Sequence, residues 1–451
     1  MNKEKFKNYV FNNELLTYES HIHGFSDKVF AEYDKKSEEK NLRSKIENLM
    51  NAKVVNHTEN KAAFHPQYRK KDNKFGGRDE LSPSSLSRLN SKLMAKDIRE
   101  ANVIVLAIGG SYEGPKLLLE SINQHDFNCV DSKVNYLFIT GSDPNEFVSK
   151  TQSLNPKDTI FIVASKSFKT DETIESLKLA LEWSIDATYF IAITSNINEP
   201  LRYGIGVKNK GDIIDFDNEV GGRYSIWSPI GQFISDFNEF NEFLDGGSKA
   251  DEDLLKPLPN DYLDFIKYLA FSDIWQNNSQ GKNIRAVLSY IWNMRSFPDY
   301  IQQLEMESLG KQANPTSGFR TTGQIIFGGY GPTAQHSYFQ LLHQGTQEIC
   351  ADIIASKENL KSLSYAQAIT QSKLLSTGAK DLKEEEKING NIPVNLFLLK
   401  KADPFSIGYL LASWEHRVFI TSVMLGINPF DQFGVSAGKI YTKKHLDENG
   451  G

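Results

Sequence analysis

Short apolar runs alternate with amphipathic segments along the first half of the chain. Four runs rich in β-branched residues have the pattern of strands buried on both faces, at 103–108, 134–140, 159–164 and 189–194. Two of the segments between them, 115–124 and 173–185, repeat apolar residues at helical spacing. Strands that alternate with helices predict a doubly wound α/β domain with a parallel sheet.

A second α/β pattern begins beyond residue 245. The segment 245–260 contains two adjacent glycines, two prolines and six charged residues, so it predicts a linker at a domain boundary. Beyond it we expect a helix over about 288–307, a strand at 324–327, a helix from 334, a strand at 394–399 and helices to the C-terminus. The charged stretch 380–387 predicts a solvated helix face or loop.

The first 45 residues are rich in Lys, Glu and Asn, and they predict helices packed on the outside of the molecule. The expected organisation is an N-terminal helical segment (1–45), a first domain (46–244) and a second domain that ends in helices (245–451). Each domain should hold a mostly parallel sheet between layers of helices, an α/β/α sandwich.

Composition places the 451-residue chain among soluble globular proteins, with 39% hydrophobic and 24% charged residues. The net charge of −6 argues against a nucleic-acid surface spread over the molecule. No apolar run is long enough to span a membrane, and residues 1–16 lack the apolar stretch of a signal peptide. Cys129 and Cys350 form no C-x-x-C pair, so we expect reduced thiols in a cytoplasmic protein.

Two strand ends carry residues suited to binding phosphate. In the first, A-I-G-G-S-Y-E-G-P at 107–115, Gly110 lets the backbone approach an anion beside Ser111 at a helix N-terminus. On its own this segment is better explained as an ordinary strand-to-helix turn. In the second, S-K-S-F-K-T-D-E-T at 165–173, small hydroxyls and a lysine can hold a phosphate group. The candidates there are Ser165, Lys166, Ser167 and Thr170.

Neighbouring strands of an open α/β sheet end at the same edge, so the two loops are expected to converge on one phosphate. The alternative for the second loop is that Thr170 caps the following helix while the lysines face solvent.

The segment 299–311 predicts the end of an amphipathic helix. Gln303 and Glu307 share a face there, whereas Glu305 and Glu307 are about 200° apart around the axis. Only one of the two glutamates can therefore point into a pocket. From spacing alone, each is better explained as an ordinary surface carboxylate.

Three further segments hold candidates for proton transfer or charge stabilisation. Thr333 is placed to cap a helix with His336 in its first turn, where the dipole favours a neutral imidazole. Gln432 and Lys439 are seven residues apart and can share a helical face. Arg223 follows two glycines and can stabilise an oxyanion, or equally make an ion pair between domains. His21 and His23 lack a third ligand, so no metal site is predicted.

Taken together these segments resemble the phosphoglucose isomerase family, which is built from two sugar-isomerase (SIS) domains. The resemblance covers nearly the whole chain in the same order. It is carried by N-H-T-E-N-K-A-A-F-H from Asn56, the two phosphate-loop segments, V-G-G-R-Y-S-I-W-S, Q-L-E-M-E-S-L-G-K, Q-H-S-Y-F-Q-L-L-H-Q-G and F-D-Q-F-G-V-S-A-G-K.

The resemblance implies interconversion of D-glucose 6-phosphate and D-fructose 6-phosphate without a metal or nicotinamide cofactor, in glycolysis and gluconeogenesis. It implies that Glu307 moves the proton between C1 and C2, that Arg223 faces the enediolate, and that His336 and Lys439 assist ring opening. The sugar phosphate would be held by Ser111 and the 165–170 loop, with Gln303 and Gln432 lining the pocket. It also implies a homodimer in which the residue matching His336 comes from the partner subunit.

Several positions depart from the usual family pattern. Leu309 stands where Asn is usual, residues 332–334 replace T-N-G, and Phe433 replaces Trp. Ser167 and Lys169 replace threonines. These changes put substrate affinity and loop geometry in question more than the reaction.

Three alternatives remain at this point. A phosphosugar-binding regulator would need only the phosphate loop and would not need Glu307, His336 and Lys439 together. An isomerase that also accepts mannose 6-phosphate would tend to carry Thr at position 432, so Gln432 favours glucose. A dinucleotide-binding dehydrogenase is disfavoured because the glycine spacing does not match.

Overall fold

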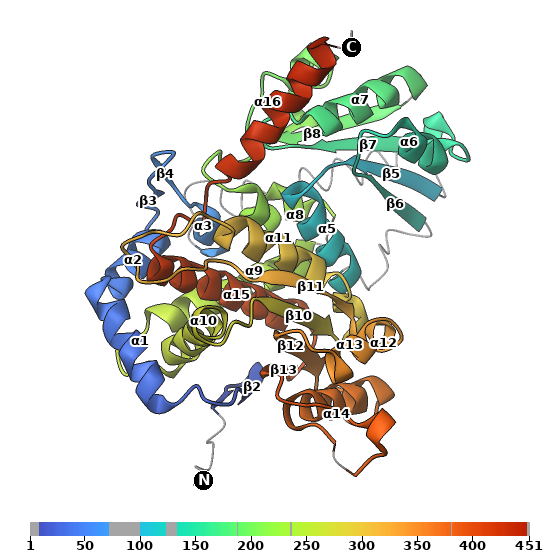
Figure 1. The fold of residues 1–451 in the computed structure, drawn as a ribbon. Coiled ribbons are helices and arrows are strands. Elements are labelled where there is room, and N and C mark those ends of the chain that lie inside the picture. Colours follow the sequence, from blue (N-terminus) through green and yellow to red (C-terminus); the bar gives the residue numbers. More distant parts are fainter. Residues whose placement is uncertain are drawn as a thin grey trace.

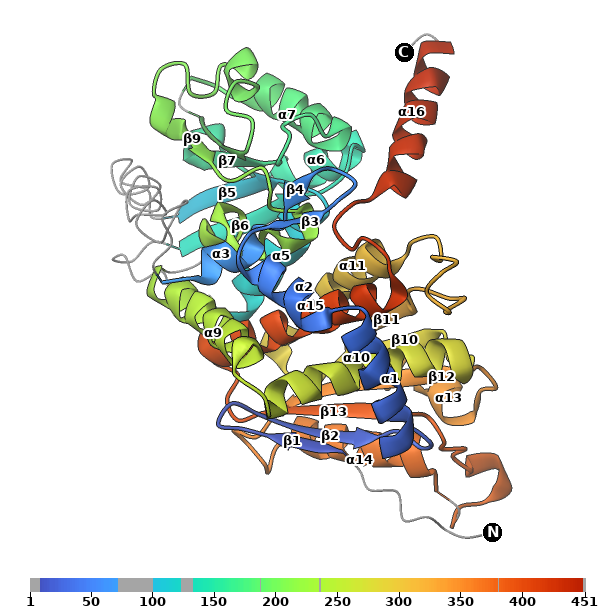
Figure 2. The same cartoon turned by 90° about the vertical axis from the view of Figure 1, so that its left-hand side faces the viewer.

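The computed structural model describes residues 9–71, 100–122, 133–186, 188–234, 237–379 and 381–448. Two β-sheets flanked by helices lie at opposite ends of the molecule (Figures 1 and 2). Between them lie the helices α9 (Phe237–Leu255), α11 (Phe297–Leu309) and α15 (Pro404–Leu425). The predicted α/β class with two mainly parallel sheets flanked by helices is therefore confirmed.

The first sheet has five parallel strands in the order β6-β5-β7-β8-β9. Its strands are β5 (Glu100–Leu106), β6 (Lys133–Ile139), β7 (Thr159–Ala164), β8 (Tyr189–Thr194) and β9 (Ile213–Asp215). The connections include α5 (Gly110–Ser121), α6 (Pro144–Thr151) and α7 (Asp171–Trp183). All six residues of β7 are buried, as its uninterrupted apolar run predicts. Because β5 and β7 are adjacent and parallel, the loops that follow them leave the same edge of the sheet.

The second sheet has six strands in the order β1-β2-β13-β12-β10-β11. Its four parallel strands are β10 (Ile284–Ser289), β11 (Ile325–Tyr330), β12 (Ile349–Ser356) and β13 (Val394–Leu399). The antiparallel pair β1 (Val10–Asn12) and β2 (Leu16–His21) extends this sheet at β13.

The N-terminal segment was expected to be helical, and for residues 10–21 that expectation is wrong. Leu16 and Tyr18 are fully buried in β2, and the Tyr18 hydroxyl donates to Asn395 Oδ1 on β13 at 2.6 Å. A partner strand far along the chain therefore decides this conformation, which local composition does not reveal. The helices expected in the segment begin later, at α1 (Asp27–Glu39) and α2 (Leu42–Met50).

The linker predicted at 245–260 is mostly helical, because α9 runs through residue 255. A Cβ on Gly246 would overlap the carbonyl oxygen of Phe405, and one on Gly408 would overlap that of Phe243. The glycines therefore allow α9 and α15 to pack backbone against backbone, rather than making the chain flexible. Only residues 256–260 connect α9 to α10 (Asp261–Ser279).

Two further predictions of secondary structure are wrong in part. The helix expected from residue 288 begins at Phe297, after β10 has ended at Ser289. Strand β12 was not predicted, because Asp352 interrupts its apolar run; in the fold, Arg417 pairs with that carboxylate at 2.8 Å. The charged stretch 381–387 is exposed, as expected.

The remaining elements are short or peripheral: β3 (Val54–Asn56), β4 (Lys61–Ala62), α3 (His65–Arg69), α8 (Pro229–Gln232), α12 (Gly331–Ala334), α13 (Phe339–Gln344), α14 (Leu363–Thr377) and α16 (Phe433–Glu448). Helix α16 leaves the body of the protein and buries none of its residues (Figure 2). Among the helices of the described residues, none combines the length and the apolar character needed to cross a bilayer. Cys350 is a buried free thiol whose pKa is raised to about 12 by burial, while Cys129 lies outside the described residues.

Candidate active site

Helix α11 separates its two glutamates as the spacing predicts. Glu307 keeps 25% of its side chain exposed, and its Oε1 lies 3.2 Å from Arg223 Nη1. Gln303, one turn earlier, donates to Glu307 Oε2 at 3.1 Å. Glu305 points to the other side of the helix and is buried, so neither carboxylate is the ordinary surface group that spacing alone allows.

Arg223 is a buried guanidinium whose position is fixed on several sides. Its Nε donates to Ser308 Oγ at 2.7 Å, and Nη1 donates to Gln432 Oε1 at 3.1 Å. Nη2 donates to the carbonyl of Asp431 at 3.0 Å and also to that of Pro429. These contacts join α11 to the segment that leads into α16, and they hold a cation against Glu307.

Lys311 and Asp431 complete this cluster, and sequence reasoning assigned neither of them a role. Lys311 Nζ lies 3.1 Å from Asp431 Oδ1 and donates to the carbonyl of Glu307 at 2.8 Å. Burial and the charge of Arg223 lower the pKa of Lys311. The sequence could have pointed to both residues by their position, because Lys311 and Asp431 each lie within a motif that supplied other candidates.

A cavity of about 460 Å³ opens at Glu307, between the end of α11 and the start of α16. Its polar side chains come from Glu307, Lys311, Gln312, Asp431 and Gln432. Residues 165–170 do not line this cavity. The cavity at Glu307 and the predicted phosphate loop at 165–170 are therefore distinct features of the structure.

The loop after β5 lies against Gln303. A Cβ on Gly109 would come 3.2 Å from Gln303 Nε2, and the residue has a φ of 57° that favours glycine. A Cβ on Gly110 would overlap the carbonyl oxygen of Gly222, directly before Arg223. The two glycines thus let the start of α5, with half-buried Ser111, reach both partners of Glu307.

The loop after β7 forms a small hydroxyl-lined turn. Ser165 Oγ and Thr170 Oγ1 are 3.2 Å apart, and Ser167 Oγ accepts from the backbone N–H of Lys169 at 3.2 Å. Thr170 stands at the N-cap of α7 but makes no capping hydrogen bond, which disfavours the simple cap interpretation. Burial lowers the pKa of Lys166 to about 8, and nearby Lys61 adds to the effect.

Two predicted catalytic residues lie apart from this cluster. Thr333 lies inside the four-residue α12 and does not cap it, and exposed His336 follows that helix rather than entering it. Lys439 lies on α16 and is fully outside the packed body. Gln432 precedes α16, so it does not share a helical face with Lys439. Within one chain, neither His336 nor Lys439 lines the cavity at Glu307.

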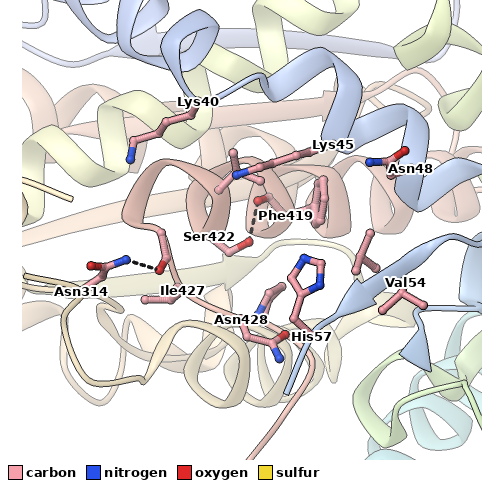
Figure 3. A pocket seen from close by; sticks show the side chains of 14 residues that line it. Lys40, Lys45, Asn48, Val54, His57, Asn314, Phe419, Ser422, Ile427 and Asn428 are labelled. Atoms are coloured by element: carbon pink, nitrogen blue, oxygen red, sulfur yellow. Dashed lines mark hydrogen bonds between the residues drawn. The ribbon is translucent and has the colours of Figure 1, made fainter. Parts of the chain in front are cut away.

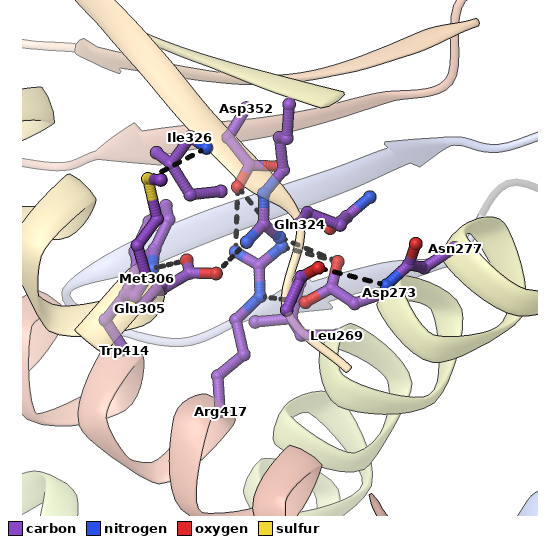
Figure 4. A network of polar contacts seen from close by, with 12 residues as sticks. Leu269, Asp273, Asn277, Glu305, Met306, Gln324, Ile326, Asp352, Trp414 and Arg417 are labelled. Atoms are coloured by element: carbon purple, nitrogen blue, oxygen red, sulfur yellow. Dashed lines mark hydrogen bonds and ion pairs between the residues drawn. The ribbon is translucent and has the colours of Figure 1, made fainter. Parts of the chain in front are cut away.

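A buried ionic network holds α11 on the side of the helix that carries Glu305 (Figure 4). Two guanidiniums, Arg285 and Arg417, face the carboxylates of Asp273, Glu305 and Asp352. Glu305 Oε1 also accepts from the Trp414 indole at 2.6 Å. Burial raises the pKa of Glu305 against the attraction of Arg285. The network ties α11 to α15 and to the second sheet, so it orients Glu307 from the opposite side of the helix.

Comparison with known proteins gives a consistent result. Residues 20–450 match the family model described as phosphoglucose isomerase. A glucose-6-phosphate isomerase of Saccharophagus degradans is 32% identical, over 90% of this chain and 81% of the relative. One from Legionella pneumophila (strain Paris) is 34% identical, over 88% of this chain and 82% of the relative.

Among solved structures, a glucose-6-phosphate isomerase from Chlamydia trachomatis shares the fold, with a TM-score of 0.82 at 24% identity. The match covers 97% of this chain and 89% of that structure. A hypothetical protein from Thermus thermophilus has a TM-score of 0.73 at 21% identity, over 96% of this chain and 99% of that one. With its matched motifs and two-sheet fold, this chain belongs to the phosphoglucose isomerase family.

Proposed function

We propose that this protein interconverts D-glucose 6-phosphate and D-fructose 6-phosphate, with Glu307 as the base that carries a proton between C2 and C1. The observation that carries the proposal is the pairing of Glu307 with Arg223 at 3.2 Å, at the mouth of a cavity. Glu307 stays partly exposed there, so a substrate can reach its carboxylate. The proposed reaction belongs to glycolysis and gluconeogenesis, so we expect the protein to act in the cytoplasm.

The proton balance assigns one task to each group. Glu307 takes the C2 proton of the open-chain aldose, and electrons from that C–H bond form the C1–C2 double bond of an enediolate. Arg223 stabilises the negative charge that develops on oxygen. Return of the proton to C1, with transfer of a hydroxyl proton from O2 to O1, yields the ketose. A positioned base contributes a factor of about 10² to 10⁴ to such a step.

The phosphate group is proposed to bind the hydroxyls of Ser111, Ser165, Ser167 and Thr170, with Lys166 supplying charge. Their placement at the ends of adjacent parallel strands supports this role. Gly110 lets the start of α5 approach the ligand, while Gln303 and Gln432 line the sugar site through their contacts with Glu307 and Arg223.

Ring opening is proposed to use His336 and Lys439, and both roles need more than the packed body of one chain. His336 is exposed and outside the cavity, so we propose that a partner subunit supplies it in a homodimer. Lys439 can act only when α16 lies over the cavity. Mixing His336→Ala with Glu307→Gln tests the shared site, because each mixed dimer regains one intact site. Random exchange should recover about a quarter of wild-type activity; no recovery would refute partner donation.

The decisive variant for the base is Glu307→Gln. It should bind fructose 6-phosphate as the wild type does, yet lose turnover in a coupled assay and lose exchange of the C2 proton with deuterated water. Glu348→Gln, at an exposed glutamate paired with Lys282, is the matched control and should keep both activities. Turnover by Glu307→Gln near the wild-type rate would show that another group is the base.

A further inference from the structure

A second cavity lies between α2, β3 and the C-terminal end of α15 (Figure 3). Its volume of about 570 Å³ is in the range of small-molecule sites. Glu307, Arg223 and the 165–170 loop do not line it. It is therefore a separate site from the one assigned to the sugar phosphate.

The cavity is lined by basic groups without a matching acid. Lys40 and Lys45 lie on one side and His57 rises from the other (Figure 3). None of the fourteen lining residues is Asp or Glu. Within the described residues, no carboxylate pairs with Lys40 or Lys45, in contrast to Lys267, which meets Asp34 at 2.7 Å.

The two lysines also repel one another. Lys45 is exposed to solvent, but its partial burial lowers its pKa, and the positive charge of Lys40 lowers it further. Two like charges that share one cavity without a counter-charge from the protein favour an anion there. A dianion satisfies both at once.

The back of the cavity is largely apolar, and two of its polar side chains already donate to backbone carbonyls. Phe419, Val423 and Ile427 contribute apolar surface. Ser422 Oγ donates to the carbonyl of Phe419 at 2.7 Å, and Asn314 Nδ2 donates to that of Gly426 at 2.8 Å. A sugar body would find few free partners on this wall, whereas a flat apolar body would bury surface against it.

We propose that this cavity binds a small organic phosphate, with its apolar body against Phe419 and its phosphate between Lys40, Lys45 and His57. This ligand differs from a hexose phosphate, because the hydroxyl-rich body of a hexose would gain little from packing against an apolar wall. The wall ends at Pro429, whose carbonyl accepts from Arg223. A ligand here would therefore touch the loop that holds the proposed catalytic arginine.

1-Naphthyl phosphate is a suitable probe, since it joins a flat apolar ring to a phosphate dianion. Binding is measured by calorimetry on the full chain, with uncharged 1-naphthol as the matched ligand. The phosphate should bind at least tenfold more tightly than the naphthol. Equal affinities would overturn the proposal, because the lysines would then contribute nothing.

Variants locate the site independently of isomerase activity. Lys40→Met with Lys45→Met should weaken the probe at least tenfold, while Lys28→Met with Lys35→Met, at exposed positions of α1, should leave affinity within twofold. Lys166→Met changes the proposed sugar-phosphate loop, and it should also leave the affinity for 1-naphthyl phosphate within twofold. If Lys166→Met removes binding and the Lys40/Lys45 pair does not, the probe occupies only the sugar-phosphate site and the proposal is wrong.

Discussion

Glu305 and Glu307 lie two residues apart on α11, and they meet opposite environments. Glu305 is buried between Arg285 and the Trp414 indole, within a network that has two guanidiniums and three carboxylates. Glu307 meets Arg223 and Gln303 and still opens onto a cavity. The comparison shows that one helix can anchor itself with one carboxylate and present the other to a cavity, because helical geometry turns them to opposite sides.

The largest expected effect separates activity from stability at these two positions. Glu307→Gln should lower kcat by about 10³-fold or more, as for loss of a general base, while the free energy of unfolding stays within about 0.5 kcal/mol. Glu305→Gln should keep most of the activity and lower stability by about 1–3 kcal/mol, because Arg285 loses a charged acceptor. Coupled assays and urea unfolding of both variants check this contrast. If Glu305→Gln and Glu307→Gln lost activity to the same extent and had the same free energy of unfolding, the contrast would be wrong.

Arg417→Met tests how much the buried ionic network around Glu305 contributes to stability. Arg417 donates to Asp273 at 2.6 and 2.7 Å and to Asp352 at 2.8 Å. Its removal leaves one guanidinium, that of Arg285, facing three buried carboxylates of this network, and the loss of stability should be about 3–5 kcal/mol. Arg320→Met, at an exposed arginine, is the control and should change stability by less than about 0.5 kcal/mol. A loss below about 1 kcal/mol for Arg417→Met would show that the network is not tightly coupled.

The pH dependence of isomerase activity should follow the protonation of Lys166. Its pKa of about 8 means that the amine is charged below that pH and neutral above it. The value of kcat/KM should therefore fall by up to about tenfold per pH unit above pH 8, as affinity for the phosphate dianion is lost. Lys166→Met should lack this alkaline limb. Lys169→Met, an exposed lysine of the same loop that pairs with Glu199 at 3.2 Å, should keep it.

The smallest expected effect concerns substrate choice beside Arg223. Gln432→Thr removes the oxygen that accepts from Arg223 Nη1 at 3.1 Å and leaves space in the cavity beside Glu307. Turnover of glucose 6-phosphate should fall by less than tenfold, about 1 kcal/mol. The rate on mannose 6-phosphate, measured in parallel, should rise relative to it. An unchanged ratio of the two rates would remove Gln432 from the residues that set specificity.

Strands β7, β8 and β13 were predictable because apolar and β-branched residues fill nearly all of their positions. The bounds of β7, β8 and β13 match the predicted runs. Strand β12 was missed because a buried Asp352 interrupts its pattern, and the linker was wrong because Gly246 serves close helix packing. In both cases the explanation is a partner on α15, more than 50 residues away.

The order of residues by itself determined the family, the alternation of strands and helices, and the rule that only one of Glu305 and Glu307 can face a pocket. These follow from local periodicity and from motifs that are contiguous in the chain. Tertiary structure alone decided which glutamate opens to the cavity, that Arg223 is held by residues 429–432, and that β1 and β2 join the second sheet. The physical reason is that burial and charge pairing depend on elements brought together from distant parts of the chain, which no local pattern records.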